Sequence, residues 1–293
     1  MVYTLGESLL DIIITTPDDV VVRPGGAMLN TAVSLGRRNI DVSLISELGD
    51  DNTAKLITNF LEMNSVITRN IESYINNNTS LALAFLDDKK KPSYTFIKNY
   101  PKERAFKNSP TFNKNDIILF GSLYSLDKQI RSTILSIIEN AKKNHATIIY
   151  DPNIRNAHHL QDSELMNSVI QNLRISSIIK GSDEDFTNIF GTDNIPDLIN
   201  EIRGINNKAL IIITLGSKGL IADYNGKQFN YPAIETKLVS TIGAGDAFNA
   251  GLIFELSNKE NKLETAIESI LQRGLQFAAK VCSTMDNYVA SEG

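Results

Sequence analysis

The sequence predicts an α/β fold with three layers, in which a mainly parallel sheet lies between two layers of helices. Short apolar runs alternate along the chain with segments whose apolar residues recur at helical spacing. The strand-like runs are largely apolar, which is typical of parallel strands buried on both faces. No internal repeat and no linker rich in Gly, Ser or Pro divides the 293 residues. Residues 1–293 are therefore expected to form a single domain.

The expected elements follow one another in chain order. Strands are expected at residues 42–46, 117–120, 147–150, 175–179 and 210–214. Apolar stripes at helical spacing indicate intervening helices, at Leu56, Ile57, Phe60 and Leu61, and at Ile130, Ile134, Ile137, Ile138 and Ala141. The first of these helices follows a Gly-Asp-Asp sequence, which is typical of a helix start.

Two stretches, residues 12–23 and about 66–105, interrupt this alternation. They contain strand-like runs, such as residues 81–86 and 94–97, with no helix between them. We expect antiparallel ribbons that project from the main sheet and form a small lid over a cleft. The alternative is an edge hairpin without a function.

The composition argues against several classes of partner. The formal net charge is −5 and the basic residues are scattered, which disfavours nucleic acid or an anionic membrane surface. No apolar stretch approaches the length of a membrane span. No Lys or Arg precedes Arg23, so the basic region of a signal peptide is missing, and a cytoplasmic location is expected. The single cysteine, Cys282, excludes an intramolecular disulfide, and three histidines are too few for a His-ligated metal centre.

The strongest chemical signal is the sequence STIGAGDAF at residues 240–248. Two glycines flank Ala244, an acid follows at Asp246, and an apolar helix comes next. Glycines let backbone N–H groups point into one concavity, and the helix adds its positive end, so the segment suits a phosphate. Asp246 could merely complement the helix dipole, but that role does not need both glycines. The chain has no P-loop, dinucleotide fingerprint or protein-kinase motifs.

A second signal lies near the N-terminus. Asp11 is followed by the pair Gly25 and Gly26, which opens a helix with Asn30 in its first turn. A carboxylate and an amide beside a glycine turn offer the paired donors and acceptors that a polyhydroxylated ligand needs. A simple turn with a local cap is the alternative.

With two further motifs, these segments resemble the ribokinase-like (phosphofructokinase-B) carbohydrate kinases over almost the whole chain. The most specific motif is Thr-x-Gly-Ala-Gly-Asp, found at residues 241–246. The others are the Gly-Gly motif with a downstream Asn, an early Asp matched by Asp11, Asp-x-Asn-x-Arg at 151–155, and Thr-x-Gly-x-x-Gly at 214–219. Residues 94–98 (YTFIK) and 180–185 (KGSDED) are similar to the lid and metal-side segments of the fructokinase and 2-keto-3-deoxygluconate kinase branch.

The resemblance implies a ribokinase-like fold and an enzyme that transfers phosphate from ATP to a sugar hydroxyl with Mg²⁺, fructose being the expected sugar. It implies that Asp246 is the catalytic base, beside an anion hole formed by Gly243, Ala244 and Gly245. The implied sugar-binding residues are Asp11, Gly25, Gly26, Asn30, Lys98 and Arg155. The implied nucleotide-site residues are Lys180, Thr214, Gly216 and Gly219, with Asp185 near the metal through water. It also implies the possibility of a homodimer formed through the lid.

The sequence departs from the family pattern at three positions. Ser240 replaces the usual Asp, Lys98 stands where Arg is common, and Asp185 replaces Glu. A lysine weakens any bidentate contact with two substrate oxygens. Arg155 has the alternative of a surface ion pair. Three other functions stay open: a 2-keto-3-deoxygluconate kinase, a nucleoside kinase of the same fold, and a catalytically silent sugar-binding regulator.

Overall fold

The fold is seen in a computed structural model that describes residues 1–86, 92–104, 106–107, 109–154, 162–257 and 263–291. Its described strands include a ten-stranded main sheet with the order β14-β13-β12-β11-β10-β9-β1-β4-β5, in which β6 also pairs with β4. The bounds of these strands are β1 Val2–Leu5, β4 Val42–Gly49, β5 Val66–Ile67, β6 Ile71–Tyr74, β9 Ile117–Gly121, β10 Thr147–Asp151, β11 Ile178–Ser182, β12 Leu210–Thr214, β13 Leu220–Tyr224 and β14 Lys227–Tyr231. All pairs are parallel except β12 with β13 and β13 with β14.

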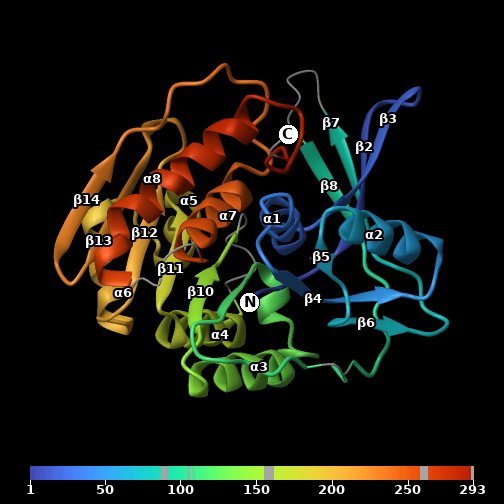
Figure 1. Ribbon diagram of the computed structural model, residues 1–293, viewed down its shortest axis with the longest axis horizontal. Coiled ribbons are helices and arrows are strands. Elements are labelled where there is room, and N and C mark those ends of the chain that lie inside the picture. The colour runs from blue at the N-terminus through green and yellow to red at the C-terminus, as the bar shows by residue number, and fades with distance from the viewer. Residues whose placement is uncertain (87–91, 105, 108, 155–161, 258–262, 292–293) are drawn as a thin grey trace.

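Helices cover both faces of this sheet (Figure 1). One hydrophobic core includes residues of α1 Ala27–Gly36, α2 Asn52–Met63, α7 Ala244–Ser257 and α8 Leu263–Cys282. The other includes residues of α3 Arg131–Lys143, α4 Ser163–Ile175, α5 Asp183–Phe190 and α6 Ile195–Ile205. Strand β9 supplies both cores, because Ile117 and Leu119 point to the first and Ile118 and Phe120 to the second. The predicted three-layer α/β fold is confirmed.

A second sheet of four strands stands away from the main sheet, at the upper right of Figure 1. Its order is β3-β2-β7-β8, with bounds β2 Leu9–Thr16, β3 Asp19–Gly25, β7 Leu81–Leu86 and β8 Pro92–Ile97. We call these four strands the lid. The lid is not purely antiparallel, because β2 and β7 run parallel. The stretch 66–105 is divided, since β5 and β6 pair with β4 in the main sheet.

One strand boundary differs from the prediction. A strand was expected from residue 175, but α4 continues to Ile175 and β11 begins only at Ile178. Ile175 is apolar because it packs from the end of α4 against the second core. Every helix in the described ranges is too short or too polar to span a membrane.

Candidate active site

The candidate site lies where α7 begins, beside the carboxyl ends of the parallel strands. Gly243 precedes α7 with a φ of 80°, and a Cβ placed there would lie 2.7 Å from the carbonyl oxygen of Asn287. Only glycine fits this position without strain. The N–H groups of the first helical turn have no acceptor inside the helix, and the helix dipole makes this end positive. The N–H of Ala244, which was predicted to face the anion, instead donates to the carbonyl of Thr241 at 3.3 Å. The start of α7 thus has the geometry of an anion site.

Asp246 lies in the first turn of α7 and is half-buried. Its Oδ2 accepts a hydrogen bond of 2.8 Å from Nδ2 of Asn30, which is buried in α1. The hydroxyl of Thr31 donates to the backbone carbonyl of Asp246 at 3.1 Å. Two segments more than 200 residues apart in sequence are thereby joined, and the carboxylate has a fixed orientation.

The Gly-Gly turn is shaped around Asp11 and Glu7. A Cβ at Gly25 would lie 1.9 Å from Oδ2 of Asp11, so glycine leaves the room that this carboxylate occupies. Gly26 has a φ of 124°, and its Cβ would lie 2.2 Å from the carbonyl oxygen of Glu7. The backbone N–H of Asn30 donates to the carbonyl of Gly26 at 2.8 Å. The structure therefore brings together Asp11, both glycines, Asn30 and Asp246.

Lys180 lies directly beneath the first turn of α7. Its buried ammonium is 2.8 Å from Oδ2 of Asp151 and 3.4 Å from the carbonyl oxygen of Gly245. Asn249 donates to the same Asp151 oxygen at 2.6 Å. Burial alone would lower the pKa of Lys180, but the charge and hydrogen bond of Asp151 outweigh it and raise that pKa. A charged ammonium therefore stays under the anion site at neutral pH.

Asp151 and Asn249 were not among the predicted site residues. The sequence could have indicated both residues. Asp151 opens the Asp-x-Asn-x-Arg motif, and Asn249 follows Asp246 by nearly one helical turn. The predicted Arg155 lies outside the described residues.

Asp185 forms a capping box at the start of α5. Its Oδ2 accepts bonds from the N–H and the hydroxyl of Ser182, at 2.8 and 2.7 Å, and its own N–H donates to that hydroxyl. Burial, and then the charge of Asp151, raise the pKa of Asp185 despite these bonds. A cation nearby would favour its carboxylate form. No group of three or more His, Cys, Asp or Glu suited to a metal occurs in the part of the chain that the structure describes.

The predicted nucleotide-site segment begins where β12 ends. The hydroxyl of Thr214 donates to the carbonyl of Gly181 at 3.3 Å. Gly219 is required by packing, because its φ is 100° and a Cβ would lie 2.0 Å from the carbonyl oxygen of Tyr231. Gly216 has a φ of 57° but faces open space. Close packing therefore requires glycine at position 219 but not at position 216.

A cavity of about 280 Å³ lies between the loop before α7 and the end of α8. It is lined by Ile234, Glu235, Thr236, Gln276, Ala279, Lys280 and Ser283. The same loop continues to the start of α7, and the N–H groups of Val239 and Ser240 hold it to the carbonyl of Cys282 at 2.8 and 3.3 Å. The sequence did not indicate this cavity, because its walls come from segments about 40 residues apart.

At the base of the lid, Lys98 follows β8 and forms an ion pair with Glu7 at 3.4 Å. Its ammonium group is half-exposed, while the Glu7 carboxylate is mostly buried. Lys98 and Asp11 therefore lie beside the same Gly-Gly turn. Lys98 pairs with Glu7, whose carbonyl lies against Gly26, and the Asp11 carboxylate lies against Gly25.

Comparisons with known proteins agree with this geometry. The model of the pfkB family carbohydrate kinases matches residues 1–291. The chain belongs to this family. It is therefore a sugar kinase. The fructokinase of Klebsiella pneumoniae is 27% identical over 259 residues, which are 87% of this chain and 84% of that protein.

Two solved structures share the kinase's fold. Fructokinase from Vibrio cholerae O395 in its fructose-, ADP- and calcium-bound form has a TM-score of 0.89 at 22% identity, over 99% of this chain and 94% of that one. The aminoimidazole riboside kinase of Salmonella enterica, complexed with aminoimidazole riboside and an ATP analogue, has a TM-score of 0.88 at 20% identity. That match covers 99% of this chain and 96% of the other.

Proposed function

We propose that this sugar kinase is a fructokinase, which transfers the γ-phosphoryl group of ATP to a hydroxyl of fructose. The observation that carries the proposal is the bond from Asn30 to Asp246, which orients a carboxylate at the positive end of α7. The kinship with fructokinases at about 25% identity supports the same sugar.

In this proposal Asp246 accepts the proton of the attacking hydroxyl as the phosphoryl group is transferred. The first turn of α7 faces the migrating phosphoryl group, and Lys180 adds a positive charge beneath it. The amide oxygen of Asn30 is buried and has no hydrogen-bond partner among the described residues, so it suits a sugar hydroxyl donor. Asp11, in β2 beside the Gly-Gly turn, accepts from a second hydroxyl.

The adenine base of ATP would occupy the cavity between the loop before α7 and α8. Thr236, Gln276 and Ser283 offer donors and acceptors there, and the connecting loop leads to the anion site. Asp185 would contact a hydrated Mg²⁺ through water, because its buried carboxylate lies at the carboxyl end of β11, near Asp151 and Lys180. Mg²⁺, when bound, supplies charge neutralisation on the phosphates.

The charges near the turn favour a neutral sugar over 2-keto-3-deoxygluconate. An acidic sugar needs a cation that is not already neutralised, and Lys98 is paired with Glu7. Asp11 and Asp246 add negative charge on the same side. These two carboxylates disfavour a substrate carboxylate, whereas they can accept hydrogen bonds from the hydroxyls of a neutral sugar.

A nucleoside kinase is the second candidate. Tyr94 and Phe96 stack with ring centroids 5.7 Å apart, and both are exposed. Through the pairs Ala82 with Phe96 and Asp11 with Ala82, Phe96 shares its lid face with Asp11. A planar base could stack against such a pair, as bases do against aromatic side chains.

The sugar is tested by measuring ADP release with ATP, Mg²⁺ and a panel of fructose, other hexoses, 2-keto-3-deoxygluconate, adenosine and aminoimidazole riboside. We expect the highest kcat/KM for fructose and no turnover without a divalent cation. A higher kcat/KM for a nucleoside would replace the fructokinase proposal with the second candidate. ATP binding without turnover of any compound would favour a silent regulator.

We also propose that the kinase forms a homodimer through its lid. The lid face opposite Asp11 carries apolar side chains in cross-strand rows, with Ile12, Val22 and Leu83 in one row and Ile14, Val20 and Phe85 in the next. Val20, Val22 and Phe85 are each 45–50% exposed. An exposed apolar patch of this kind is typical of a protein–protein interface, and a second copy offers the same surface.

A further inference from the structure

A buried arginine, Arg104, lies in the segment that leaves the lid after β8. Its side chain has no exposed surface, and its Nε donates to Oε1 of Glu47 at 3.0 Å. A second nitrogen pairs with the other oxygen of Glu47, and a third pairs with Asp127. The guanidinium also lies 3.8 Å from the ring centroid of Tyr100. All three nitrogens of the Arg104 guanidinium and one of its faces are therefore in contact with a partner.

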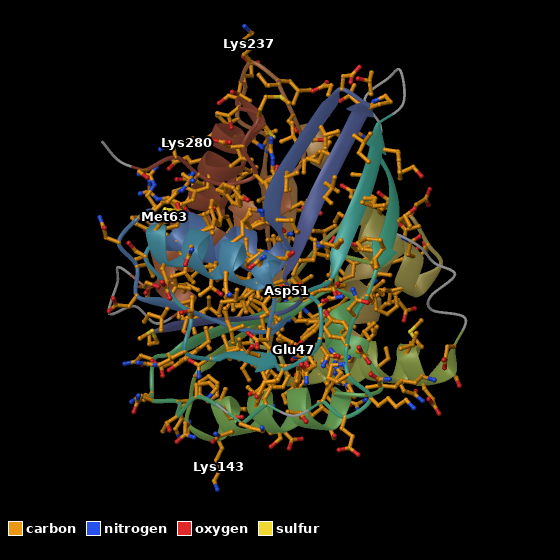
Figure 2. The ribbon with its side chains drawn as sticks, turned by 90° about the vertical axis from the view of Figure 1, so that its right-hand side faces the viewer. Glu47, Asp51, Met63, Lys143, Lys237 and Lys280 are labelled. Carbon is orange, nitrogen blue, oxygen red and sulfur yellow. The ribbon has the colours of Figure 1, made fainter. Side chains whose placement is uncertain are left out.

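Glu47 connects this arginine to the main sheet. It lies near the carboxyl end of β4, in the interior of the molecule (Figure 2). Its two oxygens also accept from the hydroxyl of Tyr74, at 2.6 Å, and from that of Tyr124. Hydrogen bonds from β6 and from the segment after β9 thus fix the Glu47 carboxylate, which in turn fixes the position of Arg104.

Tyr100 connects the arginine to the candidate site. Its hydroxyl donates to Oε1 of Glu7 at 2.8 Å, and Glu7 in turn pairs with Lys98. The carbonyl of Glu7 lies against Gly26 of the Gly-Gly turn. A continuous chain of contacts therefore runs from Glu47 through Arg104, Tyr100 and Glu7 to Lys98.

The charged groups in this series of contacts indicate that it positions the site rather than stabilises the fold. Arg104 faces two carboxylates, and removing Arg104 and Glu47 from water costs free energy that their attraction offsets only in good geometry. Apolar side chains of similar volume would stabilise the same space as well. Burial, followed by the charge of Glu7, raises the pKa of Tyr100, so its hydroxyl stays a donor at any working pH.

We propose that Tyr100 and Arg104 are positioning residues for sugar binding, which fix Glu7 and thereby hold the Lys98 ammonium beside the Gly-Gly turn that packs against Asp11. The inference rests on the proposed sugar kinase activity. Neither residue belongs to a motif that the sequence analysis assigned to the site. Their effect is expected in the sugar KM and not in the chemical step, because neither is placed beside Asp246.

Tyr100→Phe tests the proposal, since it keeps the ring beneath Arg104 and removes only the hydroxyl. We expect the sugar KM to rise about tenfold, with kcat and the KM for ATP each changed less than threefold and the Tm within about 2 °C. Tyr3→Phe is the matched control. Its hydroxyl donates to the carbonyl of Thr111 at 3.5 Å, at the amino end of β1, and its loss should change neither KM.

A double-mutant cycle separates positioning from a general structural effect. If Tyr100 acts through Glu7 on Lys98, adding Tyr100→Phe to Lys98→Gln should raise the sugar KM by less than twofold further. Full additivity, or an unchanged sugar KM in the single variant, overturns the inference.

The same test distinguishes this inference from the fructokinase proposal. If the parent phosphorylates another sugar better, fructose is wrong, and the cycle is measured with that sugar. If the parent turns over no sugar, the dissociation constant for fructose is measured by calorimetry instead. An affinity for fructose that Tyr100→Phe leaves unchanged, or no affinity in the parent, contradicts the positioning role.

Discussion

Gly25 shows how a single residue decides the geometry of the candidate site. Its missing Cβ leaves the space that the Asp11 carboxylate fills, and its φ lies outside the left-handed region. Alanine can therefore adopt the backbone conformation, and only the side chain of Asp11 must move. We therefore expect the requirement for glycine at position 25 to concern the site and not the fold.

Gly25→Ala should accordingly raise the sugar KM by at least about tenfold, because the displaced carboxylate loses a charge-assisted hydrogen bond. The free energy of unfolding should change by less than about 1 kcal/mol. Steady-state kinetics and urea unfolding measure the two quantities. Gly204→Ala is the control: no atom lies within 4 Å of a Cβ at this position in α6, and alanine should leave KM unchanged while stabilising the helix slightly. Equal sugar KM values in the two variants would show that Asp11 does not bind the sugar.

At the scale of elements, Asp51 connects α2 with the lid (Figure 2). Its Oδ1 caps α2 by accepting from the N–H of Ala54 at 2.7 Å. The same carboxylate accepts from the N–H and the hydroxyl of Thr79, at 2.9 and 2.8 Å, just before β7. Burial would raise the pKa of Asp51, but the bonds from Thr79 and Ala54 outweigh it and lower the pKa below 3.8.

Asp51→Ala should lower the free energy of unfolding by about 2 kcal/mol at neutral pH, since a cap and two further bonds are lost. A group with a lowered pKa contributes its stability above its unfolded value and loses it as pH falls through the folded pKa. The difference from the parent should therefore be constant above about pH 5 and shrink below pH 3.8. Urea unfolding across this range measures it.

Asn194→Ala, which removes a single cap bond of 3.2 Å in α6, serves as the reference and should cost about 1 kcal/mol without this pH dependence. A difference for Asp51→Ala that stays constant below pH 3.8 would contradict the role given to its carboxylate.

The lid sheet yields a second prediction at this scale. Val22→Asp should convert the proposed dimer to a monomer, because the new carboxylate would be buried without a partner in the interface. Light scattering after size exclusion measures the mass. Met63→Asp places the same change on a residue that is 77% exposed, at the end of α2 away from Asp51 (Figure 2), and should leave the dimer intact. A parent that is monomeric at tens of micromolar would rule out the lid dimer.

For the whole molecule, the three-layer architecture was predictable because short apolar runs and period-3.6 patterns are local properties of the sequence. The start of β11 was not, because an apolar residue such as Ile175 suits either a helix end or a strand. The division of residues 66–105 between two sheets also depends on pairing partners far along the chain, here β4 and β2.

The candidate site was predictable where residues form a contiguous motif, as in residues 243–246. It was not predictable where the contact joins distant segments. Glu47 and Arg104 are 57 residues apart and carry no motif, and only the structure shows that both are buried against each other. The Asn30–Asp246 bond lies between these cases, because each residue belongs to a motif but their meeting depends on how α1 packs on α7.

The central claim is that Asp246 is the catalytic base of a sugar kinase, and Asp246→Asn tests it most directly. Asparagine preserves the size of the side chain and can still accept the bond from Asn30, so fold, ATP affinity and sugar KM should change little. Asp197→Asn, at an acid in the first turn of α6, is the control for a helix-start charge and should retain full activity.

The measurement is kcat for fructose phosphorylation, followed by ADP release, in the parent and both variants. We expect a fall of about 10²- to 10⁴-fold for Asp246→Asn, the usual contribution of a general base, with Tm within about 2 °C of the parent. An Asp246→Asn enzyme that turns over within a few-fold of the parent, or one that loses stability while its folded fraction keeps full activity, would contradict the claim.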